Sequence, residues 1–131
     1  MTTKISAKAT SFTDDGYCTL LGFADDPSVP LNYVTLDMAN DPDEQDLALG
    51  LGGVHIDAGA LDIDGYDLVE DICETEAGVI VRLTADVARN AGIDQDIEIE
   101  TKRKIIDGVA TGEAVQMFKR RLLSWAKAKA K

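Results

Sequence analysis

The sequence has little of the chemistry from which most active sites and metal sites are built. Its 131 residues include 2 cysteines and 1 histidine, so paired Cys and His ligands for a transition metal are absent. No nucleophile is placed beside a base, and no glycine-rich loop has the spacing that cradles phosphate. These absences argue against catalysis and favour a surface that binds another molecule.

Long apolar segments are also missing. No window approaches the roughly 18 consecutive apolar residues of a membrane span, and the opening residues MTTKISAKATSF lack the apolar stretch of a secretory signal. We therefore expect a cytoplasmic protein without a membrane partner. The cysteines agree with that compartment, because Cys18 lies in the apolar run YCTLLGFA and Cys73 follows Ile72. Both are expected to be buried free thiols rather than a disulfide.

Basic residues are scarce over most of the chain. Residues 1–101 hold 4 Lys and Arg against 22 Asp and Glu, whereas residues 102–131 hold 9 against 2. The net charge of −11 therefore combines −18 in the first part with +7 in the second. A field of this sign opposes nucleic acid and favours a basic partner, although solubility alone also selects acidic surfaces.

Alternating hydrophobicity predicts several strands in the first half. We expect strands at 4–10, 17–24 and 32–38, with a hairpin turn at 13–16 between the first two. The residues at 17–24 are apolar on both faces, which is typical of a central strand covered on each side. Residues 25–30 are expected to form a loop, because neither proline there can donate to a ladder.

The segment from 41 to 53 carries both helix and strand signals. The string DPDE at 41–44 is a helix start with Asp41 as N-cap, yet the leucines at 47, 49 and 51 alternate as in a strand. We expect one helical turn or tight loop at 41–45 and extended chain up to residue 49. A reversal at 50–53 and a returning strand at 54–57 should follow.

The second half combines strands with two helices. The expected elements are an antiparallel strand pair at 66–74 and 78–83, a helix at 85–91 capped by Thr84 and ended by Gly92, a half-exposed strand at 96–101, a hairpin tip or linker at 105–109, and a helix from Thr111 to about Lys127. The last helix has an apolar stripe formed by Val115, Phe118, Leu122 and Trp125. We expect the stripe to dock on the protein's own acidic sheet, with a homodimer or a partner helix as the alternatives.

These elements predict an α+β protein. It should contain about seven mainly antiparallel strands, a short helix, and a C-terminal amphipathic helix packed on one face of the sheet. The length suits a single domain over 1–131, with an acidic sheet body at 1–101 and a basic helical extension at 102–131.

Two groups of carboxylates are candidates for binding a basic partner. The predicted partner-binding residues are Asp41, Asp43, Glu44, Gln45, Asp46, Asp62, Asp64 and Asp67. Such charges favour association with a cationic site, and the alternative interpretation is solvated turn and edge-strand charge that prevents edge pairing.

Calcium is the competing interpretation of the second group. The string from Asp62 to Asp67 offers hard oxygen ligands, but it lacks the loop length and closing Glu of an EF-hand. We therefore expect no metal and no other cofactor. His55, between two apolar residues of a strand, is expected to be a partly exposed polar residue rather than a ligand or base.

Five short motifs follow one another in a recognisable order. They are Gly-Phe-Ala-Asp at 22–25, Asn-Tyr before apolar residues at 32–36, Asp-Glu-Gln-Asp-Leu-x-Leu-Gly at 43–50, Gly-Val-x-Ile-Asp at 53–57 and Gly-Tyr at 65–66. This order resembles the immunity protein 10 family of bacterial polymorphic toxin systems. Members of such families are not enzymes, and each neutralises, by binding, a toxin that is made beside it.

The resemblance implies a non-enzymatic protein that binds and neutralises a cognate toxin, and the charge predicts that this toxin is basic. Two alternatives come from other classes. One is an acidic ligand- or metal-binding domain, and the other is a small hydrolase in which Asp and Glu serve as acid and base, although no oxyanion donor or nucleophile is apparent.

Overall fold

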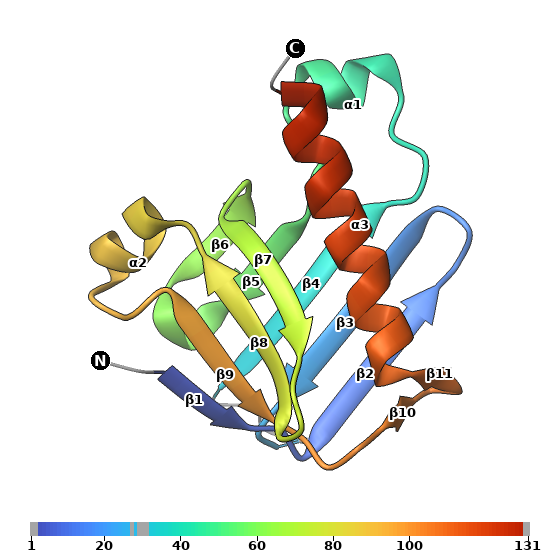
Figure 1. The fold of residues 1–131 in the computed structure, drawn as a ribbon. Coiled ribbons are helices and arrows are strands. Elements are labelled where there is room, and N and C mark those ends of the chain that lie inside the picture. The colour runs from blue at the N-terminus through green and yellow to red at the C-terminus, as the bar shows by residue number, and fades with distance from the viewer. Residues whose placement is uncertain (1–2, 27, 29–31, 130–131) are drawn as a thin grey trace.

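The computed structural model describes residues 3–129 except 27 and 29–31, and these residues form two layers (Figure 1). The first layer is an antiparallel sheet of five strands in sequence order. Its strands are β2 (Ala9–Asp14), β3 (Cys18–Ala24), β4 (Tyr33–Ala39), β5 (His55–Ala58) and β6 (Ile63–Tyr66). The helix α1 (Glu44–Ala48) lies between β4 and β5, and a short 3-10 helix (Gly59–Leu61) lies between β5 and β6.

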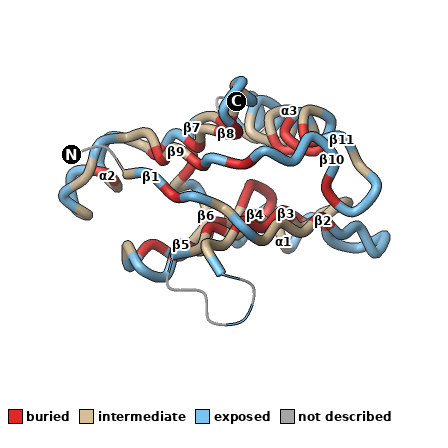
Figure 2. The backbone as a smooth tube through the Cα atoms, turned by 90° about the horizontal axis from the view of Figure 1, so that it is seen from below, coloured by how far each residue is buried: buried red, intermediate tan, exposed pale blue. Residues whose placement is uncertain are grey.

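The second layer combines a four-stranded sheet with the C-terminal helix (Figure 2). The strands, in spatial order, are β1 (Thr3–Ser6), β9 (Asp96–Glu100), β8 (Gly78–Leu83) and β7 (Val69–Glu74). The remaining elements are α2 (Ala85–Ala91), the hairpin of β10 (Ile105–Ile106) and β11 (Val109–Ala110), and α3 (Thr111–Lys129). The α+β class is confirmed, with two main sheets in place of the single sheet expected.

The core lies between the two layers. On β4 the residues Val34 and Leu36 are fully buried and Met38 nearly so, because every second residue of a strand points to the same face. Opposite them, Ile97 and Ile99 of β9 are buried. The helix α3 contributes Val115 and Phe118 to the same core, so the apolar stripe packs against this chain's own sheets.

The strand β3, second in the five-stranded sheet, is covered on one face only. Its residues Thr19, Leu21 and Phe23 are buried, whereas Cys18 on the opposite face is exposed. The expectation of a strand covered on both sides was therefore wrong, because the second layer lies on one side of the five-stranded sheet (Figure 2). The thiols are free as expected, but Cys18 is exposed and Cys73 half-buried instead of both being buried.

The strand predicted at 4–10 is two strands in different layers. β1 pairs with β9 in parallel, and β2 forms the predicted hairpin with β3. The chain changes sheet at Ala7 and Lys8, where Ala7 N–H donates to Glu100 O at 2.8 Å and Lys8 N–H to Ala24 O at 2.9 Å. Ala7 and Lys8 lie between the two strands, yet apolar and polar residues alternate in the sequence from 4 to 9, so the pattern does not mark the change of sheet.

Other boundaries shift by smaller amounts. Tyr66 ends β6, and β7 begins at Val69 after a turn at Asp67, whose φ is +62°. The helix at 85–91 and its end at Gly92, with φ of +72°, are confirmed. Thr84 occupies the N-cap position without a side-chain capping bond. The loop predicted at 25–30 lies partly outside the described residues. None of the helices in the described residues is both long enough and apolar enough to cross a bilayer.

Candidate functional site

The positive and negative charges occupy different parts of the fold. No Lys or Arg lies between Lys8 and Arg82, whereas this stretch contains 17 Asp and Glu. The stretch includes the whole five-stranded sheet and α1 (Figure 1). Five of the cations belong to the described part of α3, in the other layer. The five-stranded sheet and α1 thus form an anionic layer, whereas α3 in the other layer is rich in cations.

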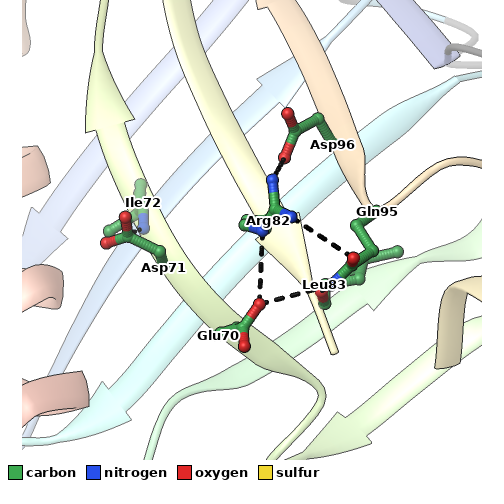
Figure 3. Close-up of polar contacts among 7 residues, drawn as sticks. All are labelled: Glu70, Asp71, Ile72, Arg82, Leu83, Gln95 and Asp96. Atoms are coloured by element: carbon green, nitrogen blue, oxygen red, sulfur yellow. Dashed lines mark hydrogen bonds and ion pairs between the residues drawn. The ribbon is translucent and has the colours of Figure 1, made fainter. Parts of the chain in front are cut away.

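Several carboxylates on the four-stranded sheet are paired with cations. Arg82 on β8 contacts Glu70 Oε2 at 3.3 Å through Nε and Asp96 Oδ1 at 3.1 Å through Nη1 (Figure 3). Gln95 joins the cluster by accepting from Arg82 Nη2 and donating to Glu70 Oε2, both at 3.3 Å. The charge of Asp96 on β9 is therefore partly neutralised in place.

Residues 40–52 project beyond the sheet between β4 and β5, and we call them the acidic protrusion (Figure 1). Its helix α1 is capped by Asp43 instead of Asp41. Asp43 Oδ1 accepts from Asp46 N–H at 2.8 Å, and Asp46 Oδ2 accepts from Asp43 N–H at 3.2 Å, which makes a capping box. The helix runs to Ala48, so the extended chain predicted up to residue 49 was wrong.

Packing explains why residues 44–48 form a helix rather than a strand. Leu47 and the ring of Trp125 both lie against Gly52, where an added Cβ would be 2.5 Å from Leu47 Cδ2 and 2.7 Å from Trp125 Cζ3. Starting the helix at Glu44 brings Leu47 to this contact. Leu49, the residue after the helix, stays 64% exposed.

The predicted residues of the protrusion have two different uses. Asp43 and Asp46 cap α1, so their carboxylates support the local fold. Asp41, Glu44 and Gln45 are exposed. The outward surface of the protrusion therefore presents carboxylates next to exposed Leu47 and Leu49, a combination of apolar and charged groups that is typical of protein–protein contacts.

Arg121 of α3 fixes both ends of the protrusion. Its Nη1 donates to Ala39 O at 2.6 Å and to Gly52 O at 3.2 Å, and its Nη2 donates to Asn40 O at 3.2 Å. Partial burial lowers the pKa of this guanidinium. Trp125, one turn further along α3, lies on Gly52 and Gly53. The helix thus holds the protrusion in one position relative to the sheets.

The second predicted group of carboxylates does not gather at one point. Asp62 ends the 3-10 helix with φ of +56°, Asp64 faces the outer side of the sheet, and Asp67 faces α3. Asp67 Oδ1 accepts from Trp125 Nε1 at 2.5 Å and pairs with Lys129 Nζ at 3.2 Å. No set of three or more His, Cys, Asp or Glu within the described residues is arranged to hold a metal ion. The geometry gives the calcium interpretation no support.

Asp64 belongs to a polar cluster on the outer face of the five-stranded sheet. His55 lies between two carboxylates, with Nδ1 3.1 Å from Asp37 Oδ2 and Nε2 2.7 Å from Asp64 Oδ1. Because neutral imidazole donates from one nitrogen only, both contacts are hydrogen bonds only when the ring is protonated. The His55 side chain is 23% exposed, as predicted for a partly exposed polar residue.

Two tyrosines flank this cluster. Tyr66 contacts His55 edge-on, with ring centroids 5.1 Å apart, and burial followed by the charge of Asp37 raises the pKa of Tyr66. The charge of Asp46 also raises this pKa, which places the acidic protrusion within electrostatic range of the cluster. Tyr33 O–H donates to Asp57 Oδ1 at 3.3 Å, and the charge of Asp57 is the main cause that raises the pKa of Tyr33.

Comparison with known proteins gives the chain a family. A family model described as Immunity protein 10 matches residues 6–105, which include the five-stranded sheet and the acidic protrusion. The chain belongs to the immunity protein 10 family. Membership of an immunity protein family points to toxin neutralisation. Among curated proteins, no match to the chain is found.

The matched region of this immunity protein 10 member ends before α3 begins at Thr111. Arg121 and Trp125, which hold the protrusion, therefore lie outside the match. Sequence reasoning did not select Arg121, although its spacing from Phe118 and Trp125 places it on the inward side of α3. Tyr33 and Asp57 were also not selected, because only the strand register brings them together.

Proposed function

We propose that this immunity protein 10 member binds a cognate bacterial toxin and neutralises it without catalysing a reaction. The family match carries the proposal. The charge distribution supports a basic partner, because the whole stretch between Lys8 and Arg82 is without a cation. The proposed contact surface is the acidic protrusion, in which Asp41, Glu44 and Gln45 are exposed beside Leu47 and Leu49.

A fixed position makes the protrusion suitable for recognition. The hydrogen bonds of Arg121 to Ala39, Asn40 and Gly52 hold its two ends. A surface that is already ordered loses less conformational entropy on binding than a loop that must be ordered by its partner. The free thiols Cys18 and Cys73 are compatible with the cytoplasm, which we propose as the compartment.

The experiment measures association of the purified chain with the toxin encoded beside it. Asp41→Lys combined with Glu44→Lys reverses charge in the protrusion and spares the capping box of Asp43 and Asp46. We expect this variant to associate more slowly and with a weaker dependence on salt, because steering of a basic partner is reduced. The same variant should protect toxin-producing cells less well than the unaltered chain.

The matched control is Asp86→Lys combined with Glu113→Lys. Both residues are exposed and belong to α2 and α3, so the control has the same net charge as the test variant. Slower association in both variants to the same degree would assign the effect to net charge alone. Association and protection at the unaltered level in the test variant would exclude the protrusion as the contact surface.

A further inference from the structure

The outer face of the five-stranded sheet is hollowed beside Tyr33. The hollow has a volume of about 310 Å³, and its walls include Ala9, Ser11, Gly22, Ala24, Tyr33 and Thr35. Gly22 is essential to its depth, because an added Cβ would lie 2.7 Å from Ser11 Oγ. In the described part of the chain, the second layer lies entirely on the other side of this sheet, so no strand or helix of that layer packs on the hollow (Figure 2).

Negative charge adjoins the hollow, and one of its carboxylates, Asp64, also contacts His55 Nε2 at 2.7 Å. Tyr33 forms one wall and donates its O–H to Asp57, which is paired directly with Asp64 in the register of β5 and β6. Like charges directly opposite one another on neighbouring strands destabilise a sheet. The five strands of this sheet contain neither Lys nor Arg. A cation supplied by another molecule would relieve this repulsion.

We propose that this face receives an arginine side chain of the bound toxin. The hollow accommodates the apolar stem and allows the planar guanidinium to stack on the ring of Tyr33. The head group then reaches the carboxylates of Asp57 and Asp64, and guanidinium–carboxylate pairs are strong because they form two parallel hydrogen bonds. Lysine fits less well, since its compact ammonium neither stacks in this way nor bridges two carboxylates. The identity of the partner rests on the proposed function, whereas the preference for arginine rests on this face alone.

The preference for arginine can be tested without the toxin. Isotope-labelled protein is titrated with N-acetyl-arginine amide and with the corresponding lysine compound, and amide chemical shifts are followed. We expect saturable shifts centred on Tyr33, Thr35, Asp57 and Asp64, with affinity several-fold higher for the arginine compound. Asp57→Asn combined with Asp64→Asn should abolish the saturable shifts, and unchanged amide signals in the rest of the protein check that the fold is intact.

The control for this titration is Glu98→Gln combined with Glu100→Gln on the four-stranded sheet. It removes the same number of charges from the opposite layer and should leave arginine binding unchanged. Shifts of equal size for arginine and lysine, or an equal loss of binding in both double variants, would overturn the proposal. Those results would indicate only general attraction of cations to an acidic protein.

The second arm uses the toxin encoded beside the chain. Asp57→Asn combined with Asp64→Asn, and separately Tyr33→Ala, should weaken toxin binding by about tenfold or more, as expected for a central charged or aromatic contact. Normal toxin binding by both variants would overturn the inference and leave the proposed function standing. Failure of the unaltered chain to bind the toxin would instead overturn the proposed function.

A further outcome concerns the occupant of the face. If the chain alone elutes as a dimer and Asp57→Asn with Asp64→Asn makes it monomeric, a second copy occupies the hollow and the toxin assignment is wrong. A monomer before and after substitution, together with weakened toxin binding, supports the toxin as the source of the arginine.

Discussion

Arg121 is an arginine whose described partners are backbone carbonyls rather than carboxylates. Its guanidinium donates to Ala39, Asn40 and Gly52, which stand at the two ends of the acidic protrusion. The planar head of arginine offers donors in several directions, so one side chain can satisfy three carbonyl groups. The residue therefore connects the stability of α3 to the shape of the proposed contact surface.

We predict that Arg121→Ala destabilises the protein by about 1–3 kcal/mol, because half-buried carbonyl groups lose charged donors. Urea unfolding measures this change, and amide exchange should become faster in residues 40–52. Arg121→Lys should recover only part of the loss, since ammonium cannot reproduce the fork geometry. Arg120→Ala is the control, because Arg120 is the exposed neighbour on the same helix. Equal effects at the two positions would contradict the role assigned to Arg121.

The tyrosine pKa shifts make a prediction about alkaline pH. The charge of Asp57 raises the pKa of Tyr33, so the folded state binds this proton more tightly than the unfolded chain does. The associated stability is complete below the unfolded pKa of about 10 and is lost as pH rises through the higher folded value. Asp57→Asn should lower the pKa of Tyr33 towards its ordinary value. Phenolate absorbance, measured in a Tyr17→Phe and Tyr66→Phe background, tests this directly. An unchanged pKa would show that Asp57 is not the cause.

At the residue scale, sequence reasoning located part of the candidate site. The group of carboxylates at 41–46 and the acid at position 64 can be recognised from the sequence, and both belong to the anionic layer. The partners of His55 were not predictable, because Asp37 and Asp64 reach it from two other strands. The sequence also does not show that Asp67 has different contacts from Asp62 and Asp64. A turn with positive φ directs Asp67 towards α3.

Among the elements, α3 makes a large contribution to the core although it lies outside the family match. Val115 and Phe118 are fully buried between the layers, while Leu123 on the opposite side of the same helix is 58% exposed. Deleting a buried aromatic ring removes apolar contact and leaves a cavity. The basic character of α3 therefore coexists with a packing role.

We predict that Phe118→Ala lowers the free energy of unfolding by about 3–5 kcal/mol. Leu123→Ala, a truncation on the exposed side of α3, should change it by less than about 0.5 kcal/mol. Denaturant unfolding of the two variants gives the comparison. A loss at Leu123 equal to that at Phe118 would mean that both faces of α3 are covered in solution.

The elements were predictable where one local signal acts alone. The helix at 85–91 follows from its flanking residues, and the hairpin of β2 and β3 follows from the turn between them. Prediction failed where tertiary contacts decide between local signals. The alternating leucines at 47–51 predict a strand, but the structure has a capped helix there that packs near Trp125. The change of sheet at Ala7 depends on strands far away in the sequence.

On the scale of the whole molecule, the separation of charge has a cost for the isolated protein. The stretch between Lys8 and Arg82 contains 17 carboxylates, most of them in the anionic layer, without an intervening Lys or Arg. Self-repulsion of this kind destabilises a compact state, and dissolved salt screens it. A basic partner would also reduce this repulsion when it binds. Relief of the repulsion would therefore contribute to the free energy of binding.

We predict that the free energy of unfolding increases when ionic strength rises from about 0.01 M to about 0.15 M, because the screening length falls from about 30 Å to about 8 Å. Thermal and urea unfolding at matched pH provide the measurement, with sodium and potassium chloride compared to exclude a specific ion. The response should be smaller in Asp57→Asn combined with Asp64→Asn. A stability independent of salt would show that repulsion within the anionic layer is negligible.

The parallel pairing of β1 with β9 sets an order of events during synthesis on the ribosome. Thr3 pairs with Ile97, 94 positions later, whereas the five-stranded sheet joins strands that follow one another along the chain. Contacts between distant segments form late, and segments near the amino terminus emerge first. We therefore expect the anionic layer to assemble on the nascent chain, while β1 stays unpaired until β9 has left the ribosome.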